Sequence, residues 1–234
     1  MTPARDIKAL IFDKDGTLFD FAATWEAWAQ AFLLRLCDQD RAKAVRMGAQ
    51  IGFDLEAAKF ARDSVVIAGT PFAIAETLHP FFPEMSLADL MRVLNDEAEQ
   101  APQQEAVPLV PFLTDLRARH YRVGVATNDA EAPARAHLGQ AGVTHLFDFI
   151  AGFDSGHGGK PEPGQLLAFA AKTGVAPAQT VMVGDSLHDL HAGRAAGMAT
   201  VGVLTGMATQ DELAPHADIV LPDIGHIPAW LGHS

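Results

Sequence analysis

Cysteine and positive charge are both scarce in this chain. Cys37 is the one cysteine among 234 residues, so no internal disulfide can form, which is typical of a protein in a reducing compartment such as the cytoplasm. Lys and Arg number 17 against 29 Asp and Glu, which gives a net charge of −12. This balance disfavours nucleic acids and anionic membranes as partners, although a local cation can still bind an anionic substrate.

Long hydrophobic runs are missing as well. No apolar stretch approaches the length of a membrane span, and the first residues, MTPARDIKAL, lack the apolar centre of a signal peptide. Hydrophobic residues nevertheless make up 49% of the chain, which is ordinary for a globular protein with a substantial core. We therefore expect a cytoplasmic protein that binds neither membranes nor nucleic acid.

The sequence does contain a series of short apolar runs. They cover residues 9–12, 123–126, 147–150, 181–183, 201–204 and 219–221. Uninterrupted runs of this length are typical of strands buried on both faces, as in a parallel sheet. Helix-like segments lie between them at 112–120, 132–141, 164–173 and 187–196, and glycines suited to a helix C-terminus follow three of these: Gly142, Gly174 and Gly197. The alternation predicts an open α/β sheet.

One stretch, from about residue 20 to residue 102, contains no convincing strand. Apolar residues recur at helical spacing between Trp25 and Leu36 and again between Leu87 and Leu94, where Ser86 is a suitable N-cap. A third helix is expected within 55–67. We predict an α/β core domain of residues 1–18 and 103–234 and an all-helical cap domain of residues 19–102. A single α+β domain without a separate lobe is the alternative.

Polar and charged side chains follow the apolar runs, at the strand ends where open α/β sheets bind their ligands. In chain order they are Asp13, Asp15, Thr127, Asn128, Lys160, Asp185 and Asp189. Carboxylate oxygens suit Mg²⁺, and Asp13 could attack a phosphorus atom while Asp15 exchanges a proton with the leaving alcohol and with water. Thr127 and Lys160 would then offset the charge of the phosphoryl oxygens.

These residues resemble, in order, the four motifs of the haloacid dehalogenase-like (HAD) hydrolase superfamily. The matching stretches are Asp13-Lys14-Asp15-Gly16-Thr17, then Thr127-Asn128, then Lys160, and finally Gly184-Asp185 with Asp189. The resemblance spans nearly the whole chain, while the cap is similar to that of the superfamily only in type. It implies a Rossmann-like, three-layer core with a mostly parallel sheet and a helical cap inserted after the first motif.

The resemblance also implies a role for each matching residue. Asp13 would be the nucleophile and Asp15 the general acid and base. Mg²⁺ would be bound by Asp13, by the backbone carbonyl of Asp15 and by Asp185, while Asp189 would support the site by pairing with Lys160. The residues expected to bind the substrate phosphate are Thr127, Asn128 and Lys160.

An aspartate at position 15 implies a phosphate monoester as substrate, and the layout is similar to phosphoglycolate phosphatase and its relatives. We therefore expect an enzyme, monomeric or homodimeric, that hydrolyses a small phosphorylated metabolite such as 2-phosphoglycolate. Two alternatives stay open. One is a phosphomutase of the β-phosphoglucomutase type, and the other is a non-catalytic sensor of a phosphorylated ligand.

Several other features have simpler interpretations. The loop 154–160 is rich in glycine but fails the nucleotide-binding pattern, because Asp154 and Pro161 stand at positions that require other residues. A zinc site at His188 and His191 is disfavoured, because no cysteine and no third histidine lies nearby. We expect His157 to be a solvated loop residue, and Trp25 and Trp28 to be cap core rather than a substrate platform. Lys14 either adds charge at the mouth of the site or is solvated.

Overall fold

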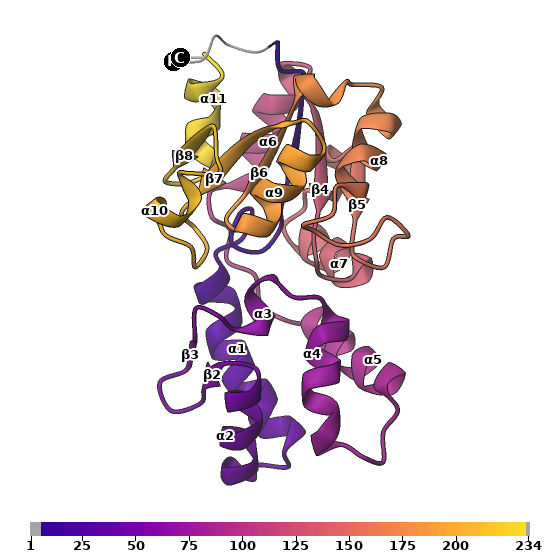
Figure 1. Ribbon diagram of the computed structural model, residues 1–234, viewed down its shortest axis with the longest axis vertical. Helices are drawn as coiled ribbons and strands as arrows, with labels where there is room; N and C mark the ends of the chain where they lie inside the picture. Colours follow the sequence, from indigo (N-terminus) through magenta and orange to yellow (C-terminus); the bar gives the residue numbers. More distant parts are fainter. Residues whose placement is uncertain (1–5, 233–234) are drawn as a thin grey trace.

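The computed structural model describes residues 6–232, and a six-stranded sheet forms the centre of its larger part (Figure 1). The strands are β1 (Ala9–Phe12), β4 (Arg122–Ala126), β5 (Phe149–Ala151), β6 (Thr180–Gly184), β7 (Ala199–Val203) and β8 (Ile219–Leu221). Their order across the sheet is β5-β4-β1-β6-β7-β8, and every neighbouring pair is parallel. The predicted α/β fold with a parallel sheet is therefore confirmed.

Helices cover both faces of this sheet, which makes three layers. Leu10 and Phe12 of β1 join a hydrophobic cluster with α6 (Leu109–Ala118), α11 (Ile227–Trp230) and Leu138 of α7 (Glu131–Gln140). Ala9 and Ile11, which alternate with them, join a second cluster with α8 (Gly164–Thr173) and α9 (Leu187–Ala195). Successive strand residues point to opposite faces, so an apolar strand is needed to fill both clusters.

A separate lobe follows β1 and lies below the sheet in the view of Figure 1. It contains α1 (Phe21–Leu36), α2 (Arg41–Gln50), α3 (Val65–Ala68), α4 (Pro71–Leu78) and α5 (Leu87–Ala98), and a hydrophobic cluster of its own. The Ser86 hydroxyl accepts a hydrogen bond from the Asp89 N–H at 3.1 Å, so Ser86 is the expected N-cap of α5. The division of the chain at residues 19 and 102 into two domains remains a prediction.

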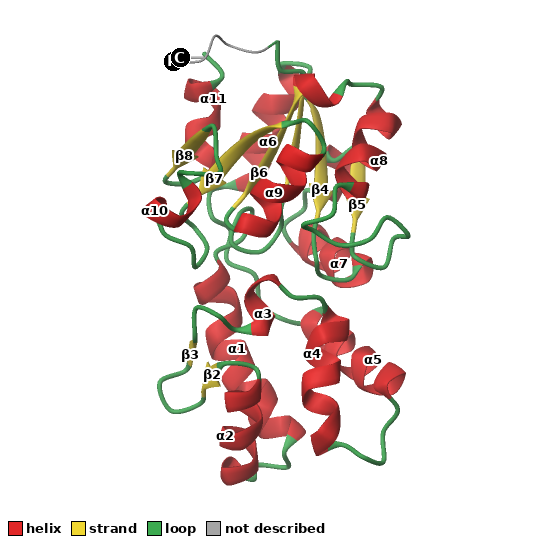
Figure 2. Ribbon diagram, in the orientation of Figure 1, coloured by secondary structure: helices red, strands yellow, loops and turns green. Residues whose placement is uncertain are grey.

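The prediction of a helix within 55–67 is wrong. A two-stranded antiparallel ladder, β2 (Phe53–Asp54) with β3 (Lys59–Phe60), occupies its start, and α3 covers only its end (Figure 2). The Asp54 carboxylate accepts hydrogen bonds from the N–H groups of Glu56 and Ala57, which favours a turn over a helix. The lobe is therefore mainly helical rather than all-helical.

The helices were also compared with the length and apolar character of a membrane-spanning helix. Within residues 6–232, no helix has both the length and the apolar character that crossing a bilayer requires.

Candidate active site

The residues expected at the site gather at one edge of the sheet because their strands are neighbours. Asp13 follows β1, Thr127 follows β4 and Asp185 follows β6, and β1 lies between the other two strands. The Asp13 N–H donates to the Val183 carbonyl at 2.8 Å, which continues the β1–β6 ladder to this edge. The carboxyl ends of three adjacent parallel strands thus place these side chains together.

Lys160 joins two of the carboxylates. Its Nζ lies 2.6 Å from Oδ1 of Asp13 and 2.6 Å from Oδ1 of Asp189, and all three side chains are buried. Burial raises the pKa of Asp13 to about 7 even though the Lys160 ammonium acts in the opposite direction. The two carboxylates raise the pKa of Lys160 against the effect of burial, so Lys160 stays charged.

Asn128 fixes the loop that carries Lys160. Its Oδ1 accepts from the Lys160 backbone N–H at 2.8 Å, and its Nδ2 donates to the Lys160 carbonyl at 2.9 Å. Both polar atoms of the Asn128 side chain are therefore engaged with the backbone of residue 160. A direct contact of this side chain with phosphate, as the sequence suggests, remains a prediction.

Three carboxylates form a group that could bind a metal ion. One oxygen each of Asp13, Asp185 and Asp189 lies within 4.8 Å of the others. Asp189 is fully occupied, because its second oxygen accepts from the N–H of Ser186 at 3.0 Å and from its hydroxyl at 2.7 Å. Asp13 and Asp185 are therefore the better ligands, and Asp189 supports them through Lys160.

Asp185 is enclosed by glycine. A Cβ atom on Gly16 or on Gly206 would lie 2.4 Å or 1.7 Å from Oδ2 of Asp185, so only glycine leaves room for this carboxylate. Gly16 also has a φ of +76°, which favours glycine. Burial and the neighbouring carboxylates raise the pKa of Asp185 well above its ordinary value. Crowded acids of this kind fit a divalent cation, because it would offset a negative charge that Lys160 only partly balances.

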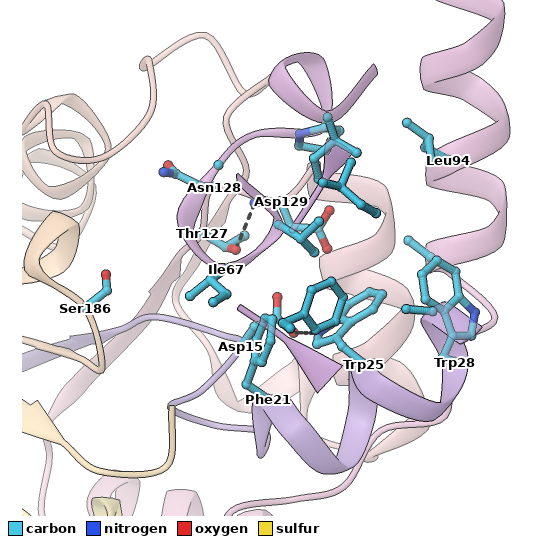
Figure 3. A pocket seen from close by; sticks show the side chains of 18 of the residues that line it. Asp15, Phe21, Trp25, Trp28, Ile67, Leu94, Thr127, Asn128, Asp129 and Ser186 are labelled. Atoms are coloured by element: carbon cyan, nitrogen blue, oxygen red, sulfur yellow. Dashed lines mark hydrogen bonds between the residues drawn. The ribbon is translucent and has the colours of Figure 1, made fainter. Parts of the chain in front are cut away.

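Asp15 contacts two donor groups, the indole of Trp25 and the ammonium of Lys14. Its Oδ1 accepts from Nε1 of Trp25 at 2.9 Å, and Figure 3 shows this indole approaching it from α1. Its Oδ2 lies 2.7 Å from Nζ of Lys14. Burial raises the pKa of Asp15, but the Lys14 ammonium and the hydrogen bonds outweigh it, so the pKa is lowered overall.

Lys14 lies in the interior, which differs from both interpretations of the sequence. Its side chain is fully buried, and its Nζ contacts Asp15, Asp129 at 3.2 Å and Nδ1 of His137 at 2.9 Å. His137 in turn places Nε2 2.7 Å from the carbonyl of Ala98 in the lobe. A carbonyl only accepts, so Nε2 is the protonated nitrogen and Nδ1 accepts from Lys14.

Asp129 and His137 were missed by the sequence analysis. Asp129 directly follows Asn128, and this adjacency could have identified it. His137 lies among Pro133, Ala134 and Leu138 on the buried face of α7, where it has no polar neighbour in sequence to mark it. Burial and the nearby Lys14 ammonium lower the pKa of His137 to about 4, so it is neutral near pH 7.

A cavity of about 980 Å³, including space open to solvent, lies between the sheet edge and the lobe. Asp13, Asp15, Thr127, Asn128 and Lys160 line its core side. Trp25 and Trp28 line its lobe side and also belong to the hydrophobic cluster of the lobe, so they are both lobe core and cavity wall (Figure 3). The cavity therefore brings the carboxylates of the sheet edge and the aromatic side chains of the lobe to one space.

The histidines of the loops and of α9 lie in different surroundings. His157 is exposed, with its ring 6.1 Å from that of Phe149, and it does not line the cavity. His188 lines the cavity, whereas His191 faces His216 at 3.3 Å on the surface. Among the described residues, the group of three potential metal ligands consists of aspartates alone.

Comparisons with known proteins agree with the geometry. Residues 7–197 match the haloacid dehalogenase-like hydrolase family. The chain is 33% identical over 220 residues to a probable phosphatase IndB of Dickeya dadantii (strain 3937), covering 92% of this chain and 88% of that protein. It is 27% identical over 233 residues to a phosphoglycolate phosphatase of Escherichia coli (strain K12), covering 96% and 90%.

Solved structures share the fold. A putative haloacid dehalogenase-like hydrolase from Bacteroides fragilis superposes with a TM-score of 0.71 at 20% identity, over 94% of this chain and 99% of that one. A β-phosphoglucomutase from Clostridium difficile gives 0.64 at 19% identity, over 97% of each chain. At these identities the likeness establishes the fold alone. The family match covers most of the chain and agrees with the sheet and with the strand-end carboxylates, so this chain belongs to the haloacid dehalogenase-like hydrolases.

Proposed function

We propose that this protein is a Mg²⁺-dependent phosphatase that hydrolyses a small phosphate monoester through an aspartyl-phosphate on Asp13. The observation that carries the proposal is the pairing of Asp13 with Lys160 at the core side of the cavity. A carboxylate nucleophile beside a fixed ammonium suits attack on a phosphoryl group, because the ammonium offsets the charge of the phosphoryl oxygens. The relatives named as phosphatases support the same activity.

Asp13, Asp185 and the backbone carbonyl of Asp15 would bind the Mg²⁺. When bound, the ion would supply positive charge against the phosphoryl oxygens and against the crowded carboxylates. Thr127, whose side chain is buried at the end of β4, would hold the phosphoryl group from the other side of Asp13. Asn128 would act by holding the loop of Lys160.

The reaction would have two steps. In the first, an Asp13 oxygen attacks phosphorus, the bond between phosphorus and the ester oxygen breaks, and the departing alkoxide takes a proton from the Asp15 carboxyl group. In the second, the Asp15 carboxylate accepts a proton from a water molecule, whose oxygen attacks phosphorus. The bond between phosphorus and the Asp13 oxygen breaks, which regenerates the Asp13 carboxylate and releases inorganic phosphate.

The surroundings of Asp15 favour its role in the second step. With its pKa lowered by Lys14, Asp15 is a carboxylate in the free protein and is ready to act as a base. For the first step it must carry a proton. The entry of a negatively charged phosphoryl group beside it would raise its pKa and favour that proton, since like charges disfavour ionisation.

The test is release of inorganic phosphate from a panel of monoesters, with Mg²⁺ and with EDTA. The panel contains 2-phosphoglycolate, sugar phosphates, nucleoside monophosphates and pyrophosphate. We expect release that requires Mg²⁺ and is lost in Asp13→Asn. Isomerisation of a sugar phosphate that depends on a sugar bisphosphate, without phosphate release, would indicate a phosphomutase. Tight binding without turnover would indicate a sensor, and either result would overturn the proposal.

The substrate suggested by the resemblance is 2-phosphoglycolate, and the lobe side of the cavity bears directly on that choice. We also propose that the protein is cytoplasmic and that it is a monomer or a homodimer.

A further inference from the structure

We propose that the alcohol portion of the substrate is an uncharged, largely apolar, ring-bearing group with a hydrogen-bond donor, rather than a small carboxylate such as glycolate. This inference rests on the proposed phosphatase function and names its substrate class. The cavity is continuous from the phosphate-binding residues of the core to the lobe, so the lobe wall contacts whatever the phosphate is attached to.

The lobe wall of the cavity is apolar. Its aromatic members are Phe21, Trp25, Trp28, Phe32 and Phe60, and aliphatic side chains such as Ile67 and Leu94 complete it (Figure 3). Among the described residues that line the cavity, none from the lobe carries a charge. A carboxylate placed against this wall would lose its hydration without gaining a charged partner, which is unfavourable.

Three cations of the lobe are engaged in ion pairs at the surface. Arg35 pairs with Glu97, Lys59 with Glu26 and Arg62 with Glu212, and all three basic side chains are at least half exposed. On the core side, Lys14 is occupied by Asp15, Asp129 and His137, and Lys160 by Asp13 and Asp189. Among the described residues, no lysine or arginine of the lobe lines the cavity, where it could bind a substrate carboxylate.

The aromatic side chains favour a ring. Trp28 stacks on Phe32 with ring centroids 4.9 Å apart and planes at 10°, and Trp25 meets Trp28 edge-on at 5.0 Å. The one polar atom of the Trp25 side chain already donates to Asp15, so what this residue offers the cavity is its hydrocarbon surface. Flat aromatic walls bind flat, apolar groups through contact area and ring–ring geometry.

One polar atom of the lobe wall is unsatisfied. Oδ1 of Asn95, in α5, is buried and has no hydrogen-bond partner among the described residues, and Asn95 lines the cavity. A buried acceptor without a partner is costly, and a substrate O–H or N–H would remove that cost. The donor on the ring is inferred from this atom.

The first experiment compares kcat/KM of the full chain with Mg²⁺ for three esters: 2-phosphoglycolate, benzyl phosphate and 4-(hydroxymethyl)benzyl phosphate. All three release a primary alcohol, so the intrinsic reactivity of the leaving group does not set the order. We expect kcat/KM for both benzyl esters to exceed that for 2-phosphoglycolate at least about tenfold, and kcat/KM for the hydroxymethyl ester to exceed that for benzyl phosphate.

A kcat/KM for 2-phosphoglycolate equal to or above those of the other esters would overturn this inference and leave the phosphatase proposal intact. No Mg²⁺-dependent release from any ester would overturn both.

A second experiment changes the wall itself. Ile67→Lys would place an ammonium in the cavity, and we expect the ratio of kcat/KM for 2-phosphoglycolate to that for benzyl phosphate to rise at least about tenfold. Ile67→Met is the matched control of similar length without charge, and Ile74→Lys replaces Ile67→Lys if thermal unfolding shows that the latter does not fold. An unchanged ratio in folded lysine variants would contradict the inference.

The role of Asn95 has its own variant. In Asn95→Leu the acceptor is gone, and we expect the advantage of the hydroxymethyl ester over benzyl phosphate to fall to about one. Asn95→Gln keeps a neutral amide acceptor and should retain the advantage. If Asn95→Leu retains it too, the donor part of the proposal is wrong.

Discussion

Nζ of Lys14 lies 2.9 Å from Nδ1 of His137, 123 positions further along the chain, in a fully buried contact. The same ammonium pairs with Asp15, and the other nitrogen of His137 bonds to the Ala98 carbonyl at the end of α5. The proposed acid–base residue is therefore connected to the lobe through a lysine and a neutral histidine. Trp25 adds a second connection, directly from α1 to Asp15.

These connections indicate why the side chain of Lys14 lies between those of Asp15 and Asp129. Asp15 and Asp129 are partly buried carboxylates that would repel one another without a cation between them. The Lys14 ammonium offsets both, and its third contact, with His137, fixes its position. Lys14 is thus a positioning residue, since it holds Asp15 while lying outside the residues that line the cavity.

We expect Lys14→Met to destabilise the protein and to slow turnover. Removal of one member of a buried ion pair leaves the others uncompensated, and typically costs about 3–5 kcal/mol. Urea unfolding measures this loss, and kcat of the folded fraction measures the effect on Asp15. Lys8→Met is the matched control, because Lys8 pairs with Asp6 on the surface and its loss should cost less than about 1 kcal/mol. Wild-type stability together with wild-type kcat in Lys14→Met would contradict this account.

Asp13→Asn should abolish turnover and leave the fold intact. The amide is no nucleophile toward phosphorus, while Lys160 keeps Asp189 as a partner. Because burial raises the pKa of Asp13 to about 7, ionisation of this group is costly in the fold, and its replacement should not lower the melting temperature in EDTA. Phosphate release and thermal unfolding measure the two effects. Activity near the wild-type value would remove Asp13 as the nucleophile.

Much of the α/β part could be predicted because its strands are buried on both faces. A strand packed between two helical layers is an unbroken apolar run, and residues 219–221 and the helix 164–173 were located as the structure has them. The run at 147–150 was placed two residues early. The strand begins at Phe149, and the side chain of Asp148, just before it, accepts hydrogen bonds from the Val123 N–H and from two arginines.

The site was predictable where it depends on strand ends and obscure where it depends on the buried face of a helix. Asp13 and Asp185 meet because their strands are neighbours, which any parallel sheet with this order would bring about. The partner of Lys14 comes from the buried face of α7, where His137 is one member of an apolar pattern. Hydrophobic periodicity places such a residue inside but does not say what it contacts.

Metal removal tests the carboxylate cluster independently of turnover. We expect EDTA to stop phosphate release and Mg²⁺ to restore it. A ligand that binds only the folded state raises its stability, so Mg²⁺ should raise the melting temperature of the wild type. The same addition should have little effect on Asp185→Asn, which lacks one proposed ligand. Asp96→Asn, on the exposed face of α5, is the control and should respond to Mg²⁺ like the wild type. An equal rise in all three proteins would place the ion elsewhere.

The pH dependence of stability should contain a contribution from Asp148, far from the cavity residues. Burial raises its pKa, but hydrogen bonds from the Val123 N–H and from Arg117 and Arg122 outweigh burial and lower it overall. A carboxylate with a lowered pKa stabilises the fold at pH values above its unfolded pKa, near 3.9. That contribution is lost as the pH falls through the lower pKa of the folded state. Asp148→Asn should therefore cost about 1–3 kcal/mol at pH 7, and the difference from wild type should shrink below about pH 4.

Urea unfolding of both proteins between pH 7 and pH 3 measures that difference. Asp115→Asn is the matched control, because Asp115 makes an exposed pair with Arg119 within one helix, and its loss should cost less than about 0.5 kcal/mol. The Asp148 carboxylate bonds to the backbone of β4 at Val123, to Arg117 of α6 and to Arg122 of β4, so its protonation weakens three hydrogen bonds at once. A difference between wild type and Asp148→Asn that stays constant down to pH 3 would mean that packing, rather than charge, accounts for the loss.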